Sequence, residues 1–252
     1  MTKSNLDDGS PIDLHARLAV IELVLGTLVA GIYYVFSQLG VVAPWVWKLV
    51  LAVQCFVSIV LYVHYLTNRK SRRLWVEGIV SMLALVPWLA IAFVWLFYVL
   101  YIPIPVFLKI LVALVCFSVI VWHATMVLVD FRRASKNESV LITIYHNDGR
   151  SLILRHSCSG YIDHLTSRTP FKGTLMWVLV SLMPFAAAIG SNANHVLGRT
   201  VGPNVLGIVV SLLGFPMSIS IIGNTYVKTM FFRVYLPLKL ERKTGKRVVL
   251  AQ

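Results

Sequence analysis

The sequence predicts an all-α polytopic membrane protein with six transmembrane helices and a small cytoplasmic β-hairpin or β-sheet element. Three observations predict this class. The 252 residues are 58% hydrophobic and only 13% charged, whereas roughly a quarter of the residues in a soluble domain are charged. The apolar residues fall in long runs, and a transmembrane helix needs about 20 such residues. One short segment between two runs instead alternates apolar and polar residues around Asn147-Asp148-Gly149.

Six apolar runs are the candidate transmembrane helices. We expect these helices over residues 18–38, 47–66, 75–101, 106–130, 174–189 and 204–227. The prolines of Ile102-Pro103-Ile104-Pro105 end the third run, because proline lacks an N–H donor and clashes with the preceding turn. The fifth run is short for a membrane crossing, and Gly214-Phe215-Pro216 predicts a kink in the sixth.

The distribution of positive charge predicts the orientation. The net charge is +13, and Lys and Arg concentrate after the second, fourth and sixth runs, while the other connections hold almost none. By the positive-inside rule, both termini are cytoplasmic. Because the outer loops are very short, we expect a bacterial inner membrane. Topology accounts for the basic composition, so we expect no nucleic-acid partner, whereas anionic membrane lipids can use the same charges.

These assignments divide the chain into five parts. The first 17 residues lack the apolar stretch of a cleavable signal, so we expect a retained cytoplasmic segment. The remaining parts are a four-helix transmembrane region (18–130), a cytoplasmic β-hairpin insert (131–173), a two-helix transmembrane region (174–227) and a basic cytoplasmic tail (228–252).

The insert and the tail both contain alternating patterns. Residues 140–145 and 151–155 predict two strands, and the Asn-Asp-Gly corner supplies residues that tolerate positive φ. An isolated two-stranded hairpin is marginally stable in water, so its apolar face needs a cover. Residues 238–242 and 246–250 alternate around Lys243-Thr244-Gly245. We therefore expect a four-stranded sheet made of two hairpins, or one β-unit per protomer that joins others in an oligomer. A disordered basic tail is the alternative.

Polar residues inside the runs are candidate functional residues, because polar groups are costly in lipid. Gln54, His123 and Asn224 are the intramembrane candidates. The ionisable residues nearer the predicted cytoplasmic edge are Glu22, His64, Glu77 and Asp130. Together they form an inner-leaflet cluster and not a ladder through the bilayer, which disfavours a proton-coupled pump.

Recognisable enzyme chemistry is missing from the sequence. It contains no GxSxG, HExxH, P-loop or paired-carboxylate motif. Cys158 lies near His156 and His164, but this spacing matches no standard zinc motif, and a Cys–His nucleophile needs both groups in one pocket. Three cysteines give neither a disulfide framework nor a CxxC pair. We therefore expect no enzymatic activity, no metal and no cofactor.

These observations favour an inner-membrane subunit or adaptor. Its basic contact face would dock a soluble cytoplasmic protein, another protomer or anionic lipid, and we expect a homo-oligomer or a subunit of a membrane complex. The expected contact residues are Arg69, Lys70, Arg72, Arg73, Arg150 and Arg155. The alternative is an oligomeric ion channel or membrane-permeabilising effector gated by the cytoplasmic element. The connection 190–202 is rich in glycine and amides but lacks a known filter motif.

Overall fold

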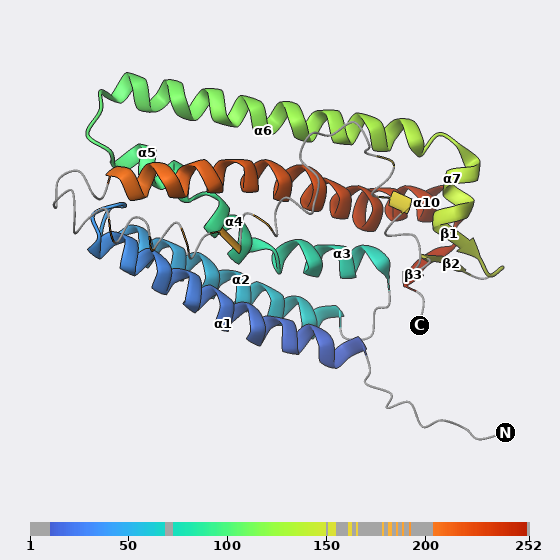
Figure 1. Ribbon diagram of the computed structural model, residues 1–252. Coiled ribbons are helices and arrows are strands. Elements are labelled where there is room, and N and C mark those ends of the chain that lie inside the picture. Colours follow the sequence, from blue (N-terminus) through green and yellow to red (C-terminus); the bar gives the residue numbers. More distant parts are fainter. Residues whose placement is uncertain are drawn as a thin grey trace.

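The computed structural model describes residues 11–68, 73–149, 151–154 and 204–250, together with isolated positions between 161 and 192. This part of the chain is mostly helical (Figure 1). Five helical segments are, by length and composition, able to cross a membrane: Arg17–Gln38, Val46–Asn68, Leu74–Tyr101, Val106–Ala134 and Asn204–Thr244. They match the first four predicted runs and the sixth. The fifth predicted run, 174–189, lies largely outside the described residues. The structure therefore supports a multi-pass membrane protein.

The first two helices form an antiparallel pair along the lower side of the bundle in Figure 1. They are α1 (Pro11–Gln38) and α2 (Val46–Asn68). The chain reverses between them at Gly40, whose φ of 73° lies in the left-handed region that glycine adopts without steric cost. Both helices extend beyond the apolar runs, because the backbone hydrogen bonds of a helix continue through polar residues at its ends.

The third run folds as three consecutive helices, where the sequence predicts one. These are α3 (Leu74–Leu83), α4 (Val86–Ala92) and α5 (Val94–Tyr101). The first interruption precedes Pro87, which is near the start of α4. Proline has no N–H to donate to the preceding turn, so the regular ladder of hydrogen bonds cannot continue through it. A second interruption lies at Phe93.

The long helix Asn204–Thr244 runs between α3–α4 and α6 (Val106–Ala134) and contacts all three (Figure 1). It continues well past Val227, where the sequence predicts its end. Helical structure also continues through Gly214-Phe215-Pro216, the site of the predicted kink. The second half contains two π-helical segments, η1 (Ile221–Val227) and η2 (Met230–Tyr235), followed by α10 (Leu236–Thr244). Such π-helical turns are frequent at functional sites.

Three short strands form a small sheet in the order β1-β2-β3. They are β1 (Tyr145–Asn147), β2 (Ser151–Leu154) and β3 (Arg247–Leu250). β1 is antiparallel to β2, whereas β3 is parallel to β2. At the predicted corner, Gly149 has a φ of 75° and its N–H donates to Oδ1 of Asn147 at 3.1 Å. The sheet thus joins the insert to the C-terminal tail.

The first predicted strand of the insert is wrong over most of its length. Residues Glu138–Ile144 form the helix α7, and strand structure begins only at Tyr145. Asn137 caps this helix, with its side chain accepting a hydrogen bond from the backbone N–H of Ser139 at 3.1 Å. Val140 and Ile144 are buried, whereas Ile142 is 65% exposed. This burial follows a helical period of four and not the alternation of a strand.

The predicted strand 238–242 of the tail is also wrong, because these residues lie in α10. Pro237 stands in the first turn of this helix, and Gly245 ends it in the left-handed conformation, with its N–H bonded to the carbonyl of Glu241 at 2.9 Å. The returning strand is present as β3. The described sheet therefore has three strands and not the four expected from two hairpins, and the tail forms α10 and β3.

One aromatic cluster attaches the sheet to the helices. Phe131 of α6 stacks on Phe231 at 5.8 Å between ring centroids and meets Phe232 edge-on at 4.8 Å. The Tyr145 hydroxyl of β1 donates to the carbonyl of Phe232 at 2.7 Å. Other buried members of this cluster are Leu74, Val127, Val140, Ile144, Leu154, Ile162, Leu236 and Val248. The sheet is therefore packed directly onto the helix ends.

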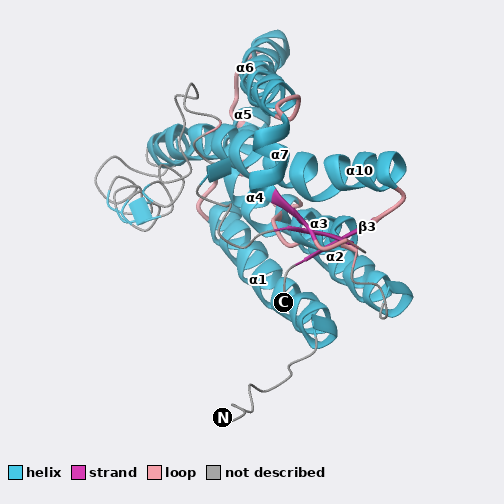
Figure 2. Ribbon diagram, turned by 90° about the vertical axis from the view of Figure 1, so that its right-hand side faces the viewer, coloured by secondary structure: helices cyan, strands magenta, loops and turns pink. Residues whose placement is uncertain are grey.

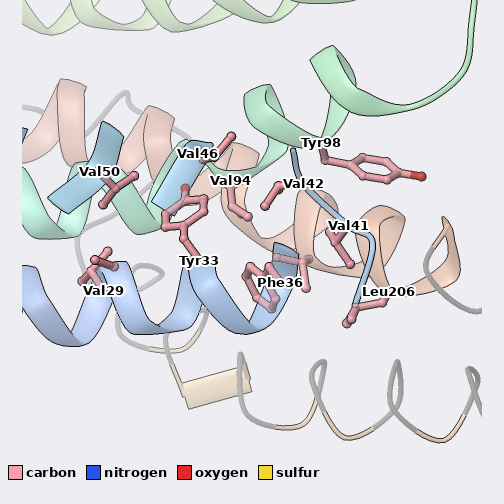
Figure 3. Packing of buried hydrophobic residues seen from close by; sticks show 12 residues of the cluster. Val29, Tyr33, Phe36, Val41, Val42, Val46, Val50, Val94, Tyr98 and Leu206 are labelled. Carbon is pink, nitrogen blue, oxygen red and sulfur yellow. The ribbon is translucent and has the colours of Figure 1, made fainter. Parts of the chain in front are cut away.

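A second cluster closes the opposite end of the bundle (Figure 3). Tyr33 and Phe36 of α1 pack there against Val41, Val42 and Val46, together with residues of α5 and of the long helix. The Tyr33 hydroxyl donates to the carbonyl of Ala90 in α4 at 2.5 Å. Large apolar cores at both ends hold the helices in one bundle.

Candidate functional site

The basic end is the end of the bundle at which α2 and α6 finish, α3 begins, and α7, α10 and the sheet are packed. Figure 2 looks along the bundle from this end and shows α10 projecting to one side. The exposed cations of the described residues at this end are Arg132, Arg133, Lys136, Arg233, Lys239, Arg242, Lys243 and Arg247. The exposed carboxylates there are Glu138 and Asp148. The described surface of this end is therefore strongly positive.

Local interactions fix the backbone that carries these cations. The carboxylate of Glu241 in α10 accepts a hydrogen bond from the backbone N–H of Val248 at 3.0 Å, which ties α10 to β3. Lys246 donates through Nζ to Oδ1 of Asn147 at 3.1 Å, which joins the tail to the β1–β2 corner. Arg233 donates to the Ser81 hydroxyl at 2.9 Å, between the long helix and α3. The positive surface thus rests on a fixed framework.

Of the six predicted contact residues, Arg73 lies within the described residues. It is half-buried at the start of α3 and forms an isolated antiparallel bridge with Val249 of β3. Its backbone therefore extends the sheet edge toward the connection between α2 and α3. The other predicted contact residues lie outside the described residues: Arg69, Lys70, Arg72, Arg150 and Arg155.

The sequence interpretation did not assign contact roles to the cations of α6 and α10. Arg132 and Arg133 occupy the last turn of α6, and Arg242 and Lys243 the last turn of α10. Cations are favoured there by the partial negative charge of a helix C-terminus. These cations are visible in the sequence as two pairs of adjacent basic residues, which indicated the orientation of the helices but not a contact surface.

The three intramembrane candidates lie in two separate parts of the bundle. Gln54 of α2 is buried against Gly26 of α1, where an added Cβ would lie 2.5 Å from the Gln54 Cβ. His123 of α6 is buried against Gly223 of η1, which leaves no room for a side chain there. Asn224 donates to the Ser220 hydroxyl within the same helix at 3.4 Å. His123 and Asn224 are therefore neighbours, whereas Gln54 faces the α1–α2 contact.

Two buried polar residues accompany Gln54 in the α1–α2 pair. Glu22 is 1% exposed and Ser58 is 8% exposed. The sequence interpretation placed Glu22 near the cytoplasmic edge and left Ser58 unremarked, because neither residue type nor spacing shows which face of a helix is covered. Fully buried, Glu22 is the carboxylate that the bundle isolates most completely among the described residues.

The described residues include no group of three or more His, Cys, Asp or Glu side chains that could hold a metal ion. Cys55 and Cys116 are free thiols within helices, and Cys158 lies outside the described residues. Comparison of the chain with protein families, curated proteins and solved structures gives no match.

Proposed function

We propose that this chain is a multi-pass protein of the bacterial inner membrane, with both termini in the cytoplasm, that serves as a non-catalytic adaptor or subunit. Its basic end docks the acidic face of a soluble cytoplasmic protein. A second protomer and the anionic lipid surface are the other occupants that the same charges could attract.

The observation that carries this proposal is the attachment of the charged elements to the helix ends. The aromatic cluster around Phe131 packs the sheet and α10 against α6 and the long helix, so the backbone that carries the cations is fixed before any partner arrives. Binding then requires little ordering of the backbone, which is one of the main costs of association. Complementary charge also accelerates encounter with a partner of opposite sign.

The position of the sheet favours a protein over lipid as the partner. The sheet lies at the far end of the bundle, beyond the start of α3 in Figure 1. Arg247 belongs to this sheet, whereas Arg132 and Arg133 are in the last turn of α6, which is itself a candidate membrane-spanning helix. Cations at headgroup level suit lipid, whereas cations beyond it are placed to meet a soluble surface.

Reversing three exposed charges tests the docking surface. Lys136, Lys239 and Arg247 lie on three separate segments, and each is exposed and outside the last turn of a helix. We expect Lys136→Glu, Lys239→Glu and Arg247→Glu together to reduce recovery of a co-purified cytoplasmic protein at least about tenfold, since an exposed ion pair contributes roughly 0.2–1 kcal/mol and reversal adds repulsion. Recovery is measured by quantitative mass spectrometry after extraction in mild detergent.

The matched control keeps the charge at the same positions, as Lys136→Arg, Lys239→Arg and Arg247→Lys, and is expected to recover the partner normally. Raised salt is expected to weaken the wild-type interaction, because exposed charges are screened over about 8 Å at physiological ionic strength. If the reversed variant keeps the same set of partners as wild type, the docking proposal is wrong. If it loses only bound anionic lipid, the surface serves the membrane instead.

An oligomeric channel is the second candidate function. The observation that favours it is the run of buried polar residues on the long helix, Ser218 and Ser220, beside the half-buried Asn224 and the π-helical segment η1. Planar-bilayer recording of the purified protein separates the two functions. A reproducible ion-selective current would support the channel, whereas a silent bilayer is expected of the adaptor.

A further inference from the structure

The contact between α1 and α2 is apolar except at two adjacent levels. The buried residues of α1 recur with alternating spacings of three and four, as in a coiled-coil seam, and those of α2 recur in a similar way. The seam positions of α1 are Ala19, Glu22, Gly26, Val29, Tyr33 and Phe36, and those of α2 are Val46, Val50, Gln54, Val57 and Leu61. Glu22 and Gln54 are thus polar residues at positions that apolar side chains ordinarily fill.

Three contacts fix how the two antiparallel helices are aligned. The rings of Tyr34 and Trp47 meet at 5.7 Å near one end. Gly26 faces Gln54 in the middle of the seam. Ala19 packs in one cluster with Val57 and Leu61 toward the basic end.

Glu22 precedes Gly26 by one helical turn, and Ser58 follows Gln54 by one turn. Because the helices are antiparallel, these two steps lead in the same direction. Glu22 and Ser58 therefore lie at the same level, directly beside the level of Gln54.

The polar side chains at these two levels include buried atoms that form no hydrogen bond. Oε1 of Glu22, both Oε1 and Nε2 of Gln54, and Oγ of Ser58 are buried without a hydrogen-bond partner. Each buried polar group without a hydrogen bond destabilises the folded protein by roughly 1–3 kcal/mol. Several such groups close together therefore indicate that another molecule or ion binds them. Buried polar atoms that lack a partner in the protein usually form hydrogen bonds with an ordered water molecule or contact a bound ligand.

Tyr226 of η1 approaches these levels from the long helix. Its hydroxyl donates to the carbonyl of Met82 in α3 at 2.7 Å, and Val80 and Leu83 of the same helix pack in one cluster with Ala19 of α1 and Val57 of α2. Because its one proton is committed to Met82, the phenol oxygen can only accept a further hydrogen bond or face a cation. The two levels are thus lined by oxygen atoms from α1, α2 and the long helix.

The charge of Glu22 has no buried cationic counterpart among the described residues. No Lys or Arg of the described residues is buried. The charged or titratable groups of the described residues toward the basic end include Arg17 on α1, which is exposed, and three half-buried residues: His64 on α2, Glu77 on α3 and Lys228 on the long helix. Helix α4, which also packs on α1, has no titratable residue. The carboxylate of Glu22 is the one charged group among otherwise neutral oxygen ligands, so a single bound monovalent cation would neutralise the site.

We propose that Glu22, Gln54 and Ser58 form a buried binding site for a small monovalent cation, either a proton or Na⁺, with Tyr226 as its third wall. Carboxylate, amide and hydroxyl oxygens are hard ligands that suit such ions and do not suit soft transition metals. An ionisable residue enclosed by transmembrane helices commonly marks an ion or proton site. This inference is independent of the docking surface at the basic end.

A hydrophobic carbodiimide tests the site in the purified full-length protein. The reagent modifies protonated carboxyl groups in apolar surroundings: the carboxyl oxygen adds to the carbodiimide carbon, and the carboxyl proton passes to its nitrogen. Peptide mass spectrometry then locates the adduct. We expect an adduct on Glu22 that is lost in Glu22→Gln, while the more exposed Glu77 and Glu138 stay unmodified.

Two titrations distinguish the cations. Slower labelling as Na⁺ rises at constant pH would assign a sodium site, because the bound ion displaces the proton that the reagent needs. Slower labelling only as the pH rises would assign a proton site. Both outcomes support the proposal. It is overturned if Glu22 stays unmodified in the folded protein, or if its labelling rate depends on neither pH nor Na⁺.

A second variant tests the participation of Gln54. Gln54→Leu keeps the approximate volume and removes the amide oxygen, so we expect the midpoint of protection to shift about tenfold in Na⁺ concentration or by about one pH unit. Gln38→Leu makes the same chemical change at the far end of α1 and is expected to leave the midpoint unchanged. If both variants have the same midpoint, Gln54 is not a ligand of the cation. Size-exclusion chromatography before labelling confirms that each variant is folded.

Discussion

Replacing Phe131 by alanine is expected to lower the free energy of unfolding by about 3–5 kcal/mol, the usual cost of removing a buried phenylalanine. Phe131 is buried between Phe231 and Phe232 and belongs to the cluster that also contains Ile144, Leu154 and Val248. Its loss leaves a cavity where α6, the long helix and the sheet meet. The midpoint of unfolding in mild detergent, on heating or on addition of denaturing detergent, measures the effect.

The matched control is Phe107→Ala, at the other end of α6, where the side chain is 66% exposed. We expect this change to stay within about 0.5 kcal/mol of wild type, as is usual for exposed positions. Phe131→Ala should also open the tail to trypsin at the Lys and Arg residues of α10, because α10 loses its packing. If both variants unfold like wild type, the sheet is not held by this cluster.

The second large effect is expected from Gly78→Val in α3. A Cβ at this position would lie 2.7 Å from Cγ2 of Val234 and 2.9 Å from the carbonyl oxygen of Arg233. The carbonyl is part of the π-helical backbone of η2 and cannot rotate away as a side chain would. Valine must therefore push α3 from the long helix, which we expect to destabilise the protein by about 1–3 kcal/mol or more.

Gly31→Val is the control for this change, because it places the same side chain on a helix with no other atom within 4 Å. Both substitutions alter helix propensity equally, so the difference in unfolding midpoint reports the contact with η2 alone. We expect Gly31→Val to unfold at or slightly above the wild-type midpoint, since valine favours a helix more than glycine does. Equal destabilisation of the two variants would contradict the close approach of α3 and η2.

The long apolar runs were predictable because membrane helices need about 20 apolar residues, and such runs are visible without knowledge of packing. Helix ends and interruptions were less predictable. The division of residues 74–101 into α3, α4 and α5 depends on Pro87, whose effect within an apolar run varies with its neighbours. The extension of the last helix from Val227 to Thr244 passes through Lys228 and Arg233, polar residues that ended the predicted span.

The two incorrect strands have a common cause. Residues spaced by four lie on one face both in a strand and in a helix, so Val140 and Ile144 could not distinguish the two structures. The distinguishing signals were at the ends: Asn137 as the cap of α7, and Pro237 and Gly245 at the limits of α10. Of these three residues, the sequence interpretation used only Gly245, as part of the turn expected at Lys243-Thr244-Gly245.

The buried level at Glu22 could not be predicted, because it depends on the alignment of α1 with α2. The sequence shows one acidic residue within an apolar run, near its end. The contacts that align α1 with α2, such as that between Gly26 and Gln54, place Glu22 beside Ser58 inside the bundle. The pairing of β3 with β2 is likewise a long-range contact, and the sequence alone does not reveal whether such strands pair in parallel.

Thiol labelling from the two sides of the membrane tests the central claim, that the basic end faces the cytoplasm. In a chain whose Cys55, Cys116 and Cys158 are replaced by serine, single cysteines are introduced as Lys239→Cys on α10 and as Trp45→Cys at the opposite end of the bundle. With a membrane-impermeant maleimide, we predict that intact cells with an opened outer membrane label Trp45→Cys but not Lys239→Cys, and that disrupted cells label both. Labelling of Lys239→Cys in intact cells, with Trp45→Cys protected, would contradict the account.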